Sequence, residues 1–255
     1  MERPWMGYLS LIWGLSLSEF KLKYRGSVLG FLWSLLNPLF ILLTLYVVFH
    51  IFMNVTIPNY ELYLLLGIVL WNFFVKGTMI GLTSIVGRGA MIKKVYFPRE
   101  IIVLSLCLTE LYSALCSLIV FGVILLILKP GLSASMLLFP LILLKEFLLI
   151  MGVSLALSAL YVYYRDILQI WEVVVQAGFW ATPIVYSISI IPPKYYQMYM
   201  LNPMSIVVVS SRDALIYGQA GNLPGLLLGF GYYLLIFLAG YIIFRHYEPR
   251  FAEEV

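Results

Sequence analysis

The sequence predicts an all-α, polytopic membrane protein with six transmembrane helices. Of its 255 residues, 63% are hydrophobic and only 11% are charged, and the mean hydropathy is +1.00. A soluble domain of this length could not bury so much apolar surface. The apolar residues also form continuous runs instead of alternating with polar ones, which indicates spanning helices rather than the strands of a β-barrel.

Residues 1–25 are predicted to form an amphipathic helix that lies in the membrane interface and does not cross the bilayer. The segment lacks a cationic start and a small-residue cleavage site, so we do not expect a cleavable secretory signal. At helical spacing, an apolar stripe opposes a stripe of small and basic residues. The first stripe is Trp5, Leu9, Trp13, Leu17, Phe20 and Tyr24, and the second is Ser10, Gly14, Ser18, Lys21 and Arg25.

Six apolar runs are predicted to cross the bilayer, so that the whole chain forms a single transmembrane domain. The expected spans are residues 29–53, 62–86, 99–128, 134–160, 167–189 and 223–244. Residues 192–219, between the last two spans, are interrupted by Asn202-Pro203, Arg212-Asp213 and Gly218. We expect one or two short re-entrant or interfacial helices there, because irregular backbone is tolerated at membrane depth only against protein or water.

The lysines and arginines predict the orientation of the chain. Of the sixteen, eleven lie in segments expected on one side of the membrane, three on the other and two within spans. Short cytoplasmic segments collect such residues, so the excess places both termini in the cytoplasm. Six spans satisfy that parity.

Residues 87–100, GRGAMIKKVYFPRE, form a basic hinge between the second and third spans. The spacing of Met91, Val95 and Tyr96 predicts a short amphipathic helix, and Pro98 is suited to begin the next span. Two interpretations remain open: a partner protein grips this helix, or a basic loop rests on anionic headgroups. The charged residues of the hinge are Arg88, Lys93, Lys94, Arg99 and Glu100.

Four charged residues lie within predicted spans: Lys76, Glu110, Lys145 and Glu146. Each costs about 2.5–3.5 kcal/mol at mid-membrane, so such residues usually face the bundle interior or each other. Lys76 and Glu110 lie on antiparallel neighbouring spans and are expected to pair, whereas the consecutive Lys145 and Glu146 must point to different faces. A proton or ion path is the alternative to neutralising pairs. Pairs are favoured, because a relay normally needs a longer chain of titratable groups.

Aromatic residues make up 16% of the chain, and some lie along the spans rather than at their ends. Aromatic rings can stack on the C–H faces of sugars, while Tyr and Trp can hydrogen-bond sugar hydroxyls. A ladder of such rings would form a track for a glycan. Ordinary core and lipid packing is the alternative, and spacing alone favours it. The candidates are Trp33, Phe40 and Tyr46 in the first span and Phe179, Trp180 and Tyr186 in the fifth.

Several kinds of chemistry find no support in the sequence. No G-x-x-x-x-G-K-[ST] phosphate-binding loop occurs. His50 and His246 are expected near opposite membrane surfaces, which argues against a metal cluster and a Ser-His-Asp triad. Cys107 and Cys116 lie nine residues apart in one span, a spacing that suits neither a disulfide framework nor a metal site. The net charge of +4 is too small to indicate a nucleic-acid partner.

Six segments resemble the permease subunit of the type-two ABC exporters, in the branch that exports O-antigen and related polysaccharides. They occur in the expected order along nearly the whole chain. The segments are YRGSVLGFLWSLLNPL (24–39), KKVYFPREI (93–101), YYRDI (163–167), TPIVY (182–186), LNP (201–203) and EPRFAEEV (248–255). Teichoic-acid, lipid and drug exporters of the same family remain alternatives.

The resemblance implies a homodimer with two separate ATP-binding subunits in the bacterial inner membrane, exporting a lipid-linked polysaccharide. ATP and Mg²⁺ would bind to the partner ATPase, so this chain would hold no cofactor and would not be an enzyme. Residues 192–219 would form gate helices, and the first and fifth spans would line the pathway. The basic hinge, as a coupling helix over residues 87–98, would contact the ATPase through Arg88, Met91, Lys93, Lys94, Val95, Tyr96 and Phe97. The cytoplasmic entrance would contain Tyr24, Arg25, Arg165 and Asp166.

Two functions of other classes fit the sequence less well. A secondary transporter or channel would need ion sites at the midplane and usually an inverted repeat, and neither is evident. A membrane-embedded transferase would need facing catalytic acids or bases near the interface. Only Asp166 and Glu172 are candidates for such groups.

Overall fold

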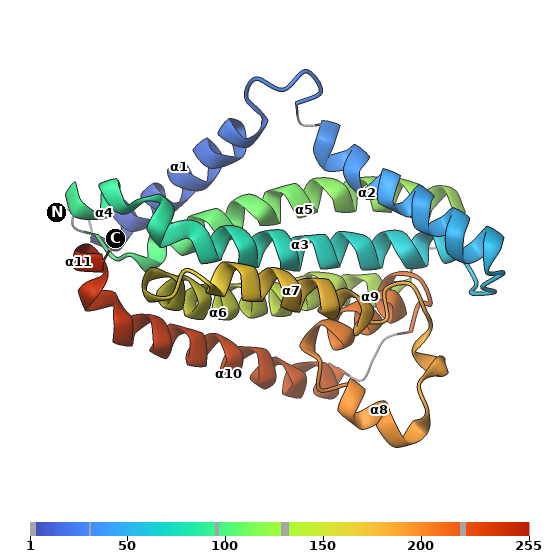
Figure 1. Ribbon diagram of the computed structural model, residues 1–255. Coiled ribbons are helices and arrows are strands. Elements are labelled where there is room, and N and C mark those ends of the chain that lie inside the picture. The colour runs from blue at the N-terminus through green and yellow to red at the C-terminus, as the bar shows by residue number, and fades with distance from the viewer. Residues whose placement is uncertain (1–3, 31, 95–96, 129–132, 220–222, 255) are drawn as a thin grey trace.

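The computed structural model describes residues 4–30, 32–94, 97–128, 133–219 and 223–254, and all regular elements in these ranges are helices. The long helices run side by side along one axis (Figure 1). The beginning of α1 lies together with α4 and α11 at one end of the bundle, which we call the α4 end. The region of η1, α8 and α9 lies at the other, which we call the α9 end.

The elements follow the predicted order of helices and connections. They are α1 (Pro4–Tyr24), α2 (Leu32–Leu45), the π-helix η1 (Tyr46–Phe52), α3 (Tyr60–Gly87), α4 (Gly89–Lys94), α5 (Glu100–Leu128), the 3-10 helix η2 (Ala134–Leu138), α6 (Phe139–Tyr163), α7 (Ile167–Trp180), the 3-10 helix η3 (Ile188–Ile190), α8 (Pro193–Tyr199), α9 (Pro203–Leu215), α10 (Leu223–Tyr247), the 3-10 helix η4 (Glu248–Arg250) and α11 (Phe251–Glu254). The predicted segment 192–219 therefore contains two short helices, α8 and α9.

Five helical segments in the described chain are long and apolar enough to cross a membrane. Their length and composition confirm a multi-pass helical membrane protein. They are Leu32–Phe52, Tyr60–Gly87, Glu100–Leu128, Ala134–Tyr163 and Gly229–Arg250.

The predicted fifth span, residues 167–189, is wrong in its extent. Only α7 is a regular helix there, and its 14 residues measure roughly 21 Å, which is less than the ~30 Å hydrocarbon core. The chain turns after Trp180, where Pro183 lacks the N–H that would continue a helix. α7 is therefore followed by a turn and not by further α-helix (Figure 1), and a sixth crossing of the membrane stays a prediction.

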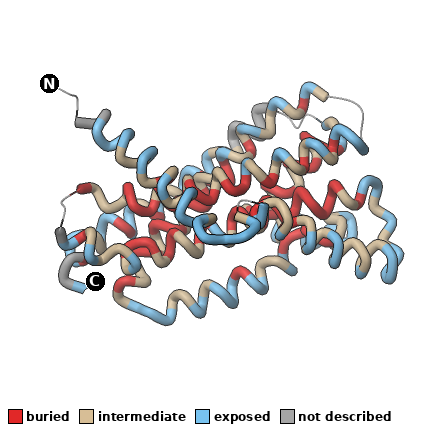
Figure 2. Tube along the Cα trace, turned by 90° about the horizontal axis from the view of Figure 1, so that it is seen from above, coloured by how far each residue is buried: buried red, intermediate tan, exposed pale blue. Residues whose placement is uncertain are grey.

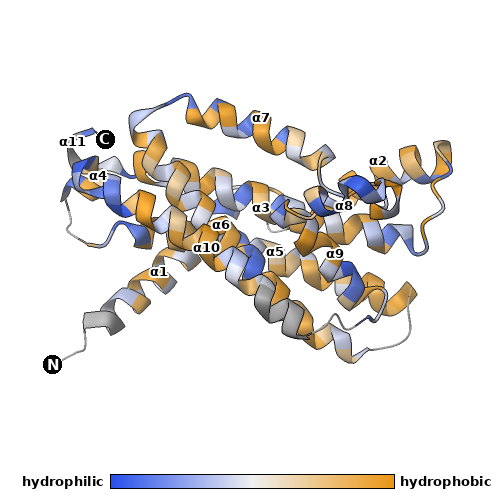
Figure 3. Cartoon of the chain, turned by 90° about the horizontal axis from the view of Figure 1, so that it is seen from below, coloured by the Kyte–Doolittle hydropathy of each residue, from blue (hydrophilic) through white to orange (hydrophobic). Residues whose placement is uncertain are grey.

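α3 forms the centre of the bundle and packs between α5 and α6. In the apolar stretch of α3, 72% of the residues are buried, against 6% in the span that contains α2. Figure 2 shows the buried residues gathered in the middle of the bundle and exposed residues on the outer helices. Hydrophilic residues collect near α4, α11 and α8, whereas the long helices are mostly apolar (Figure 3).

α1 covers part of α5 with a face that the sequence pattern did not identify. Ser16, which belongs to neither predicted stripe, is fully buried. Its Oγ lies 3.2 Å from Tyr112 Oη, and its carbonyl oxygen accepts a hydrogen bond from Thr109 Oγ1 at 3.0 Å. The helix itself is thus observed over Pro4–Tyr24. Its position in the membrane interface stays a prediction.

Candidate functional site

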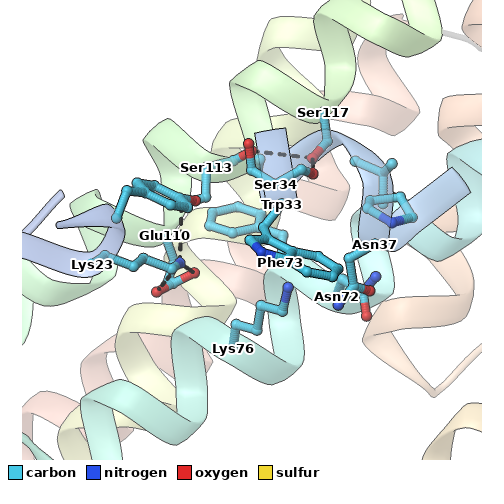
Figure 4. Close-up of a pocket in the computed structure, with 14 residues that line it drawn as sticks. Lys23, Trp33, Ser34, Asn37, Asn72, Phe73, Lys76, Glu110, Ser113 and Ser117 are labelled. Atoms are coloured by element: carbon cyan, nitrogen blue, oxygen red, sulfur yellow. Dashed lines mark hydrogen bonds and ion pairs between the residues drawn. The ribbon is translucent and has the colours of Figure 1, made fainter. Parts of the chain in front are cut away.

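A polar cavity of about 130 Å³ lies among the apolar helices, between α1, α2, α3 and α5 (Figure 4). Polar and aromatic side chains gather in it, although the surrounding helices are apolar along most of their length. The cavity is lined by Lys23, Tyr24, Trp33, Ser34, Asn37, Pro38, Val69, Asn72, Phe73, Lys76, Glu110, Ser113, Ala114 and Ser117.

Helical spacing explains how the cavity becomes polar. Glu110, Ser113 and Ser117 follow one another at i, i+3 and i+7 and therefore share one face of α5. Asn72 and Lys76 are four residues apart on α3 and face the same way. This periodicity of polar residues within apolar spans is the sequence signal for the cavity, and the charged residues alone do not reveal it.

Glu110 pairs with Lys23 of α1, so the expected pair between Lys76 and Glu110 is wrong. Lys23 Nζ donates to Glu110 Oε1 at 2.8 Å and Oε2 at 2.7 Å, and to Ser113 Oγ at 3.0 Å. The Glu110 side chain is only 4% exposed. The lysine comes from α1 because that helix leans on α5, an approach that the sequence of neither helix indicates.

Lys76 is exposed and points into the cavity between Glu110 and Asn72 (Figure 4). Within the described ranges it forms no hydrogen bond or ion pair. It lies eleven residues before the end of α3, which is roughly 16 Å from the α4 end. The buried Asn72 Nδ2 also has no hydrogen-bond partner among the described residues. The cavity thus presents two donor groups without acceptors.

Lys145 and Glu146 of α6 are both buried but have different surroundings, as their sequence positions predict. Lys145 Nζ lies 5.8 Å from the centre of the Tyr233 ring, within range of a cation–π interaction. Both carboxylate oxygens of Glu146 lack hydrogen-bond partners among the described residues. The two charges do not form an ion pair with each other.

The six candidate aromatic residues are distributed over several places. Trp33 is 46% exposed and lines the polar cavity. Phe40 and Tyr46 line a separate, mostly apolar cavity, and Phe179 and Trp180 line another between α2, α3 and α7. Tyr186 donates through Oη to the Trp180 carbonyl at 2.7 Å. A continuous glycan track along them stays a prediction.

Asn72 connects two of these cavities, because it lines both the polar cavity and the one that contains Phe179 and Trp180. Phe179 is partly buried and meets Trp71 edge-on at 6.2 Å, whereas Trp180 is exposed. Of the six candidates, the exposed side chains are therefore Trp33, Phe40 and Trp180.

Arg212 of α9 connects three elements at the α9 end, a role that the sequence analysis missed. Its side chain is 2% exposed. Nη2 donates to the carbonyls of Tyr63 and Ile184, both at 2.9 Å, and Nη1 donates to the carbonyl of Pro183. Burial lowers its pKa to about 10, so the guanidinium stays charged at neutral pH. α9 is thereby attached to α3 and to the turn after α7.

The basic hinge contains the short helix α4, whose six described residues are Gly89–Lys94. Ile92 and Phe97 are buried, and α4 contacts the C-terminal helix α11, so part of the apolar side of the hinge packs against this chain. Arg88 Nη2 lies 2.5 Å from Glu19 Oε1 of α1. Lys93 is exposed.

Some coupling-helix predictions cannot be placed completely. Val95 and Tyr96 lie outside the described residues. Lys94 is the last residue of α4, and only its backbone is described. Met91 packs partly buried against the core. The hinge nevertheless presents a basic surface at Lys93 on a helix that the chain itself holds in place.

The four entrance candidates fall into two groups. Tyr24 lines the polar cavity, with Oη 3.3 Å from Ser113 Oγ, and the exposed Arg25 directly follows α1. Arg165 and Asp166 are exposed in the turn between α6 and α7, where the Arg165 guanidinium lies 5.3 Å from the Tyr161 ring. Only Tyr24 is therefore part of the cavity.

The described residues contain no group of three His, Cys, Asp or Glu side chains that could hold a metal ion. Cys107 and Cys116 are free thiols.

Comparison with known proteins assigns this architecture to a family. Residues 10–216 match the family described as ABC-2 type transporter. Two O-antigen export system permease proteins RfbA from Klebsiella pneumoniae are 32% and 30% identical over 258 residues, which covers 97% of this chain and 96% of each relative. The RfbA permease of Myxococcus xanthus is 29% identical over 253 residues, with the same coverage.

Proposed function

The chain belongs to the ABC-2 type transporter family, and we propose that it is the membrane subunit of an ATP-driven exporter that moves a lipid-linked polysaccharide of the O-antigen type out of the cytoplasm. The observation that carries this proposal is the similarity to three O-antigen export permeases over 97% of the chain. The likeness is therefore not confined to one motif.

The energy for export would come from other subunits. The sequence contains no G-x-x-x-x-G-K-[ST] loop that could hold nucleotide phosphates. We therefore propose two ATP-binding partner chains, which bind ATP and Mg²⁺ while this chain forms the path. Binding of ATP to the partners would shift the helices between closed and open arrangements.

The α4 end would face the cytoplasm of a bacterium and the α9 end the opposite side of the inner membrane. The excess of Lys and Arg at the α4 end supports this orientation. We propose α4 as the coupling helix, with Lys93 toward the ATPase. Because α4 lies between α3 and α5 in the chain and contacts α11, a force on it would reach two central helices directly.

A second copy of the chain would cover the apolar faces of α2 and α7. Leu32, Phe40 and Leu43 of α2 are exposed, as are Val173 and Trp180 of α7. Exposed apolar faces at membrane depth can contact lipid or another protein chain. A homodimer formed there would place the candidate aromatic residues near its interface, where a glycan could slide along them.

The function can be tested by complementation in the source bacterium. Deleting the gene should abolish surface polysaccharide and cause the lipid-linked precursor to accumulate in the cytoplasmic leaflet. Restoring the gene together with its ATPase should reverse both effects. Normal surface polysaccharide in the deletion strain, with no second permease present, would contradict the proposal.

The coupling role can be tested by reversing the basic charge of α4. The double variant Lys93→Glu, Lys94→Glu should insert normally, because the hinge lies outside the hydrocarbon, but should retain about tenfold less ATPase on co-purification. Lys194→Glu, on α8 at the other end, is the matched control and should retain the ATPase fully. Undiminished binding and export by the double variant would rule out the coupling role.

A further inference from the structure

The C-terminal tail, residues 248–254, folds back against the hinge that contains α4. It consists of the 3-10 helix η4 and the short helix α11. α11 contacts both α4 and α6, and Figure 1 shows it beside α4. The last residues of a chain are usually poorly ordered unless specific contacts hold them. The contacts of this tail therefore indicate what it does at the α4 end.

Phe251 anchors the tail in the bundle. Its side chain is fully buried, as is that of Phe244 in α10. The two rings meet edge-on, with 5.3 Å between their centroids, an arrangement that aromatic pairs favour. The carbonyl of Tyr247, at the end of α10, accepts a hydrogen bond from Tyr163 Oη of α6 at 3.3 Å. The tail thus begins at a point where α10 is attached to the end of α6.

Arg99 connects the hinge to this tail. Its Nη1 donates to the carbonyl of Glu248. Its guanidinium carbon lies 5.7 Å from the centre of the Phe251 ring, within range of a cation–π interaction. Arg99 directly precedes α5. One side chain therefore joins the start of a central helix to the backbone and the buried ring of the tail.

The hinge is held on both sides of α4. Before α4, Arg88 Nη2 lies 2.5 Å from Glu19 Oε1 of α1, and after α4, Arg99 reaches the tail. The hinge residues Ile92 and Phe97 are buried. An isolated helix as short as α4 is not stable by itself in water. Contacts with the rest of the chain, the tail among them, therefore decide where α4 points.

We propose that the C-terminal tail positions α4 for the ATP-binding partner, with Arg99 and Phe251 as the positioning residues. The inference rests on the proposed function for the identity of that partner. A surface that is already ordered before binding loses less conformational freedom when a partner docks on it. The tail also attaches the hinge to α10 and α6, so a displacement of α4 reaches these helices as well as α3 and α5.

Hydrogen exchange on the purified full-length permease tests this role of the tail without any partner. Phe251→Ala removes the buried ring, and Arg99→Met removes the donor but keeps an unbranched apolar side chain. In each variant the backbone amides of residues 88–92 should exchange about tenfold faster, because the hinge opens locally. Amides in the centre of α3 should keep their protection, which verifies that the bundle is folded. Arg250→Met, at an exposed position of the same tail, is the matched control and should exchange like the original chain.

Three results of this experiment would overturn the proposal. The first is unchanged exchange of residues 88–92 in a folded Arg99→Met variant. The second is equally faster exchange in α3, which would mean that Arg99 stabilises the whole bundle. The third concerns the double variant Arg99→Met, Phe251→Ala, which should exchange within about twofold of the faster single variant, because both changes break the same contact. Multiplied effects would show that the two residues act independently.

Co-purification of the ATP-binding subunit then tests the positioning itself. Arg99→Met and Phe251→Ala should each retain about tenfold less of this subunit, because a loose α4 must be ordered on binding. Arg99→Lys keeps a cationic donor and should retain more than Arg99→Met. Faster exchange at the hinge with undiminished retention and export would overturn the positioning role. Failure of the proposed function is distinguishable, since a deletion strain would then keep its surface polysaccharide, whereas the exchange rates of the isolated permease would stay the same.

Discussion

Lys76 and Arg212 are both cations in apolar surroundings, but Arg212 donates to protein acceptors and Lys76 has none among the described residues. Arg212 is 2% exposed, and its donors reach carbonyls of Tyr63, Pro183 and Ile184. Lys76 is exposed to a cavity and has no acceptor in the described chain. A cation whose N–H donors are all bound to protein acceptors stabilises the fold, whereas a cation without such acceptors is available to a ligand.

The geometry at Arg212 explains why it needs no acidic partner. After α7 ends, the carbonyls of Pro183 and Ile184 are no longer part of a regular helix and can accept from the planar guanidinium. Gly67 leaves the space that the guanidinium occupies, since a Cβ there would lie 2.7 Å from Arg212 Nη2. The ring of Tyr63, 3.3 Å from the guanidinium carbon, adds a cation–π interaction.

The largest expected effect is that of Arg212→Met. It leaves buried carbonyls without a donor and should destabilise the chain by about 3 kcal/mol or more. Thermal unfolding in detergent measures the loss. The exposed Arg250→Met is the matched control, for which we expect little change. A variant as stable as the original chain would mean that the hydrogen bonds of Arg212 do not stabilise the fold, and the contrast with Lys76 would then fail.

A double-mutant cycle on Lys23 and Glu110 should show the next largest effect. Glu110→Gln and Lys23→Met each break a partly buried ion pair, and their coupling energy should be about 1–2 kcal/mol. The same cycle on Lys76 and Glu110 should give less than about 0.5 kcal/mol. If instead the second cycle shows the larger coupling, then Lys76 is a structural cation like Arg212.

Lys76→Met should have a smaller effect on stability, and of the opposite sign to Arg212→Met. Removing an unpaired charge should leave the free energy of unfolding unchanged or raise it by up to about 1 kcal/mol, while export falls. Parallel measurement of the unfolding temperature and of surface polysaccharide per inserted permease tests both parts. A large loss of stability would identify a structural partner for Lys76.

The smallest effects concern two of the candidate aromatic residues. Trp33→Leu keeps apolar volume in the cavity but removes the ring, so export should slow by about two- to tenfold, equivalent to about 0.5–1.5 kcal/mol of stacking. Phe179→Leu should mainly lower stability, because Phe179 packs against Trp71. Normal export by Trp33→Leu would assign that ring to packing.

The sequence alone determined the class of the protein and most of its helices. Continuous apolar runs require helices in a bilayer, since every backbone donor and acceptor must then be satisfied within the segment. For the same reason α3, α5 and α6 lie close to their predicted limits. The short helices α8 and α9 follow from local breaks such as Asn202-Pro203, where proline prevents a continuous helix.

Only the tertiary structure decided which charged groups meet. Glu110 pairs with Lys23 rather than Lys76 because α1 packs obliquely on α5, and a packing angle depends on surfaces far apart in the sequence. Likewise, the short α7 and the buried Arg212 depend on each other, since the carbonyls released after α7 are satisfied by a side chain about thirty residues later. Such pairings depend on distances between helices, which a pattern along one helix does not contain.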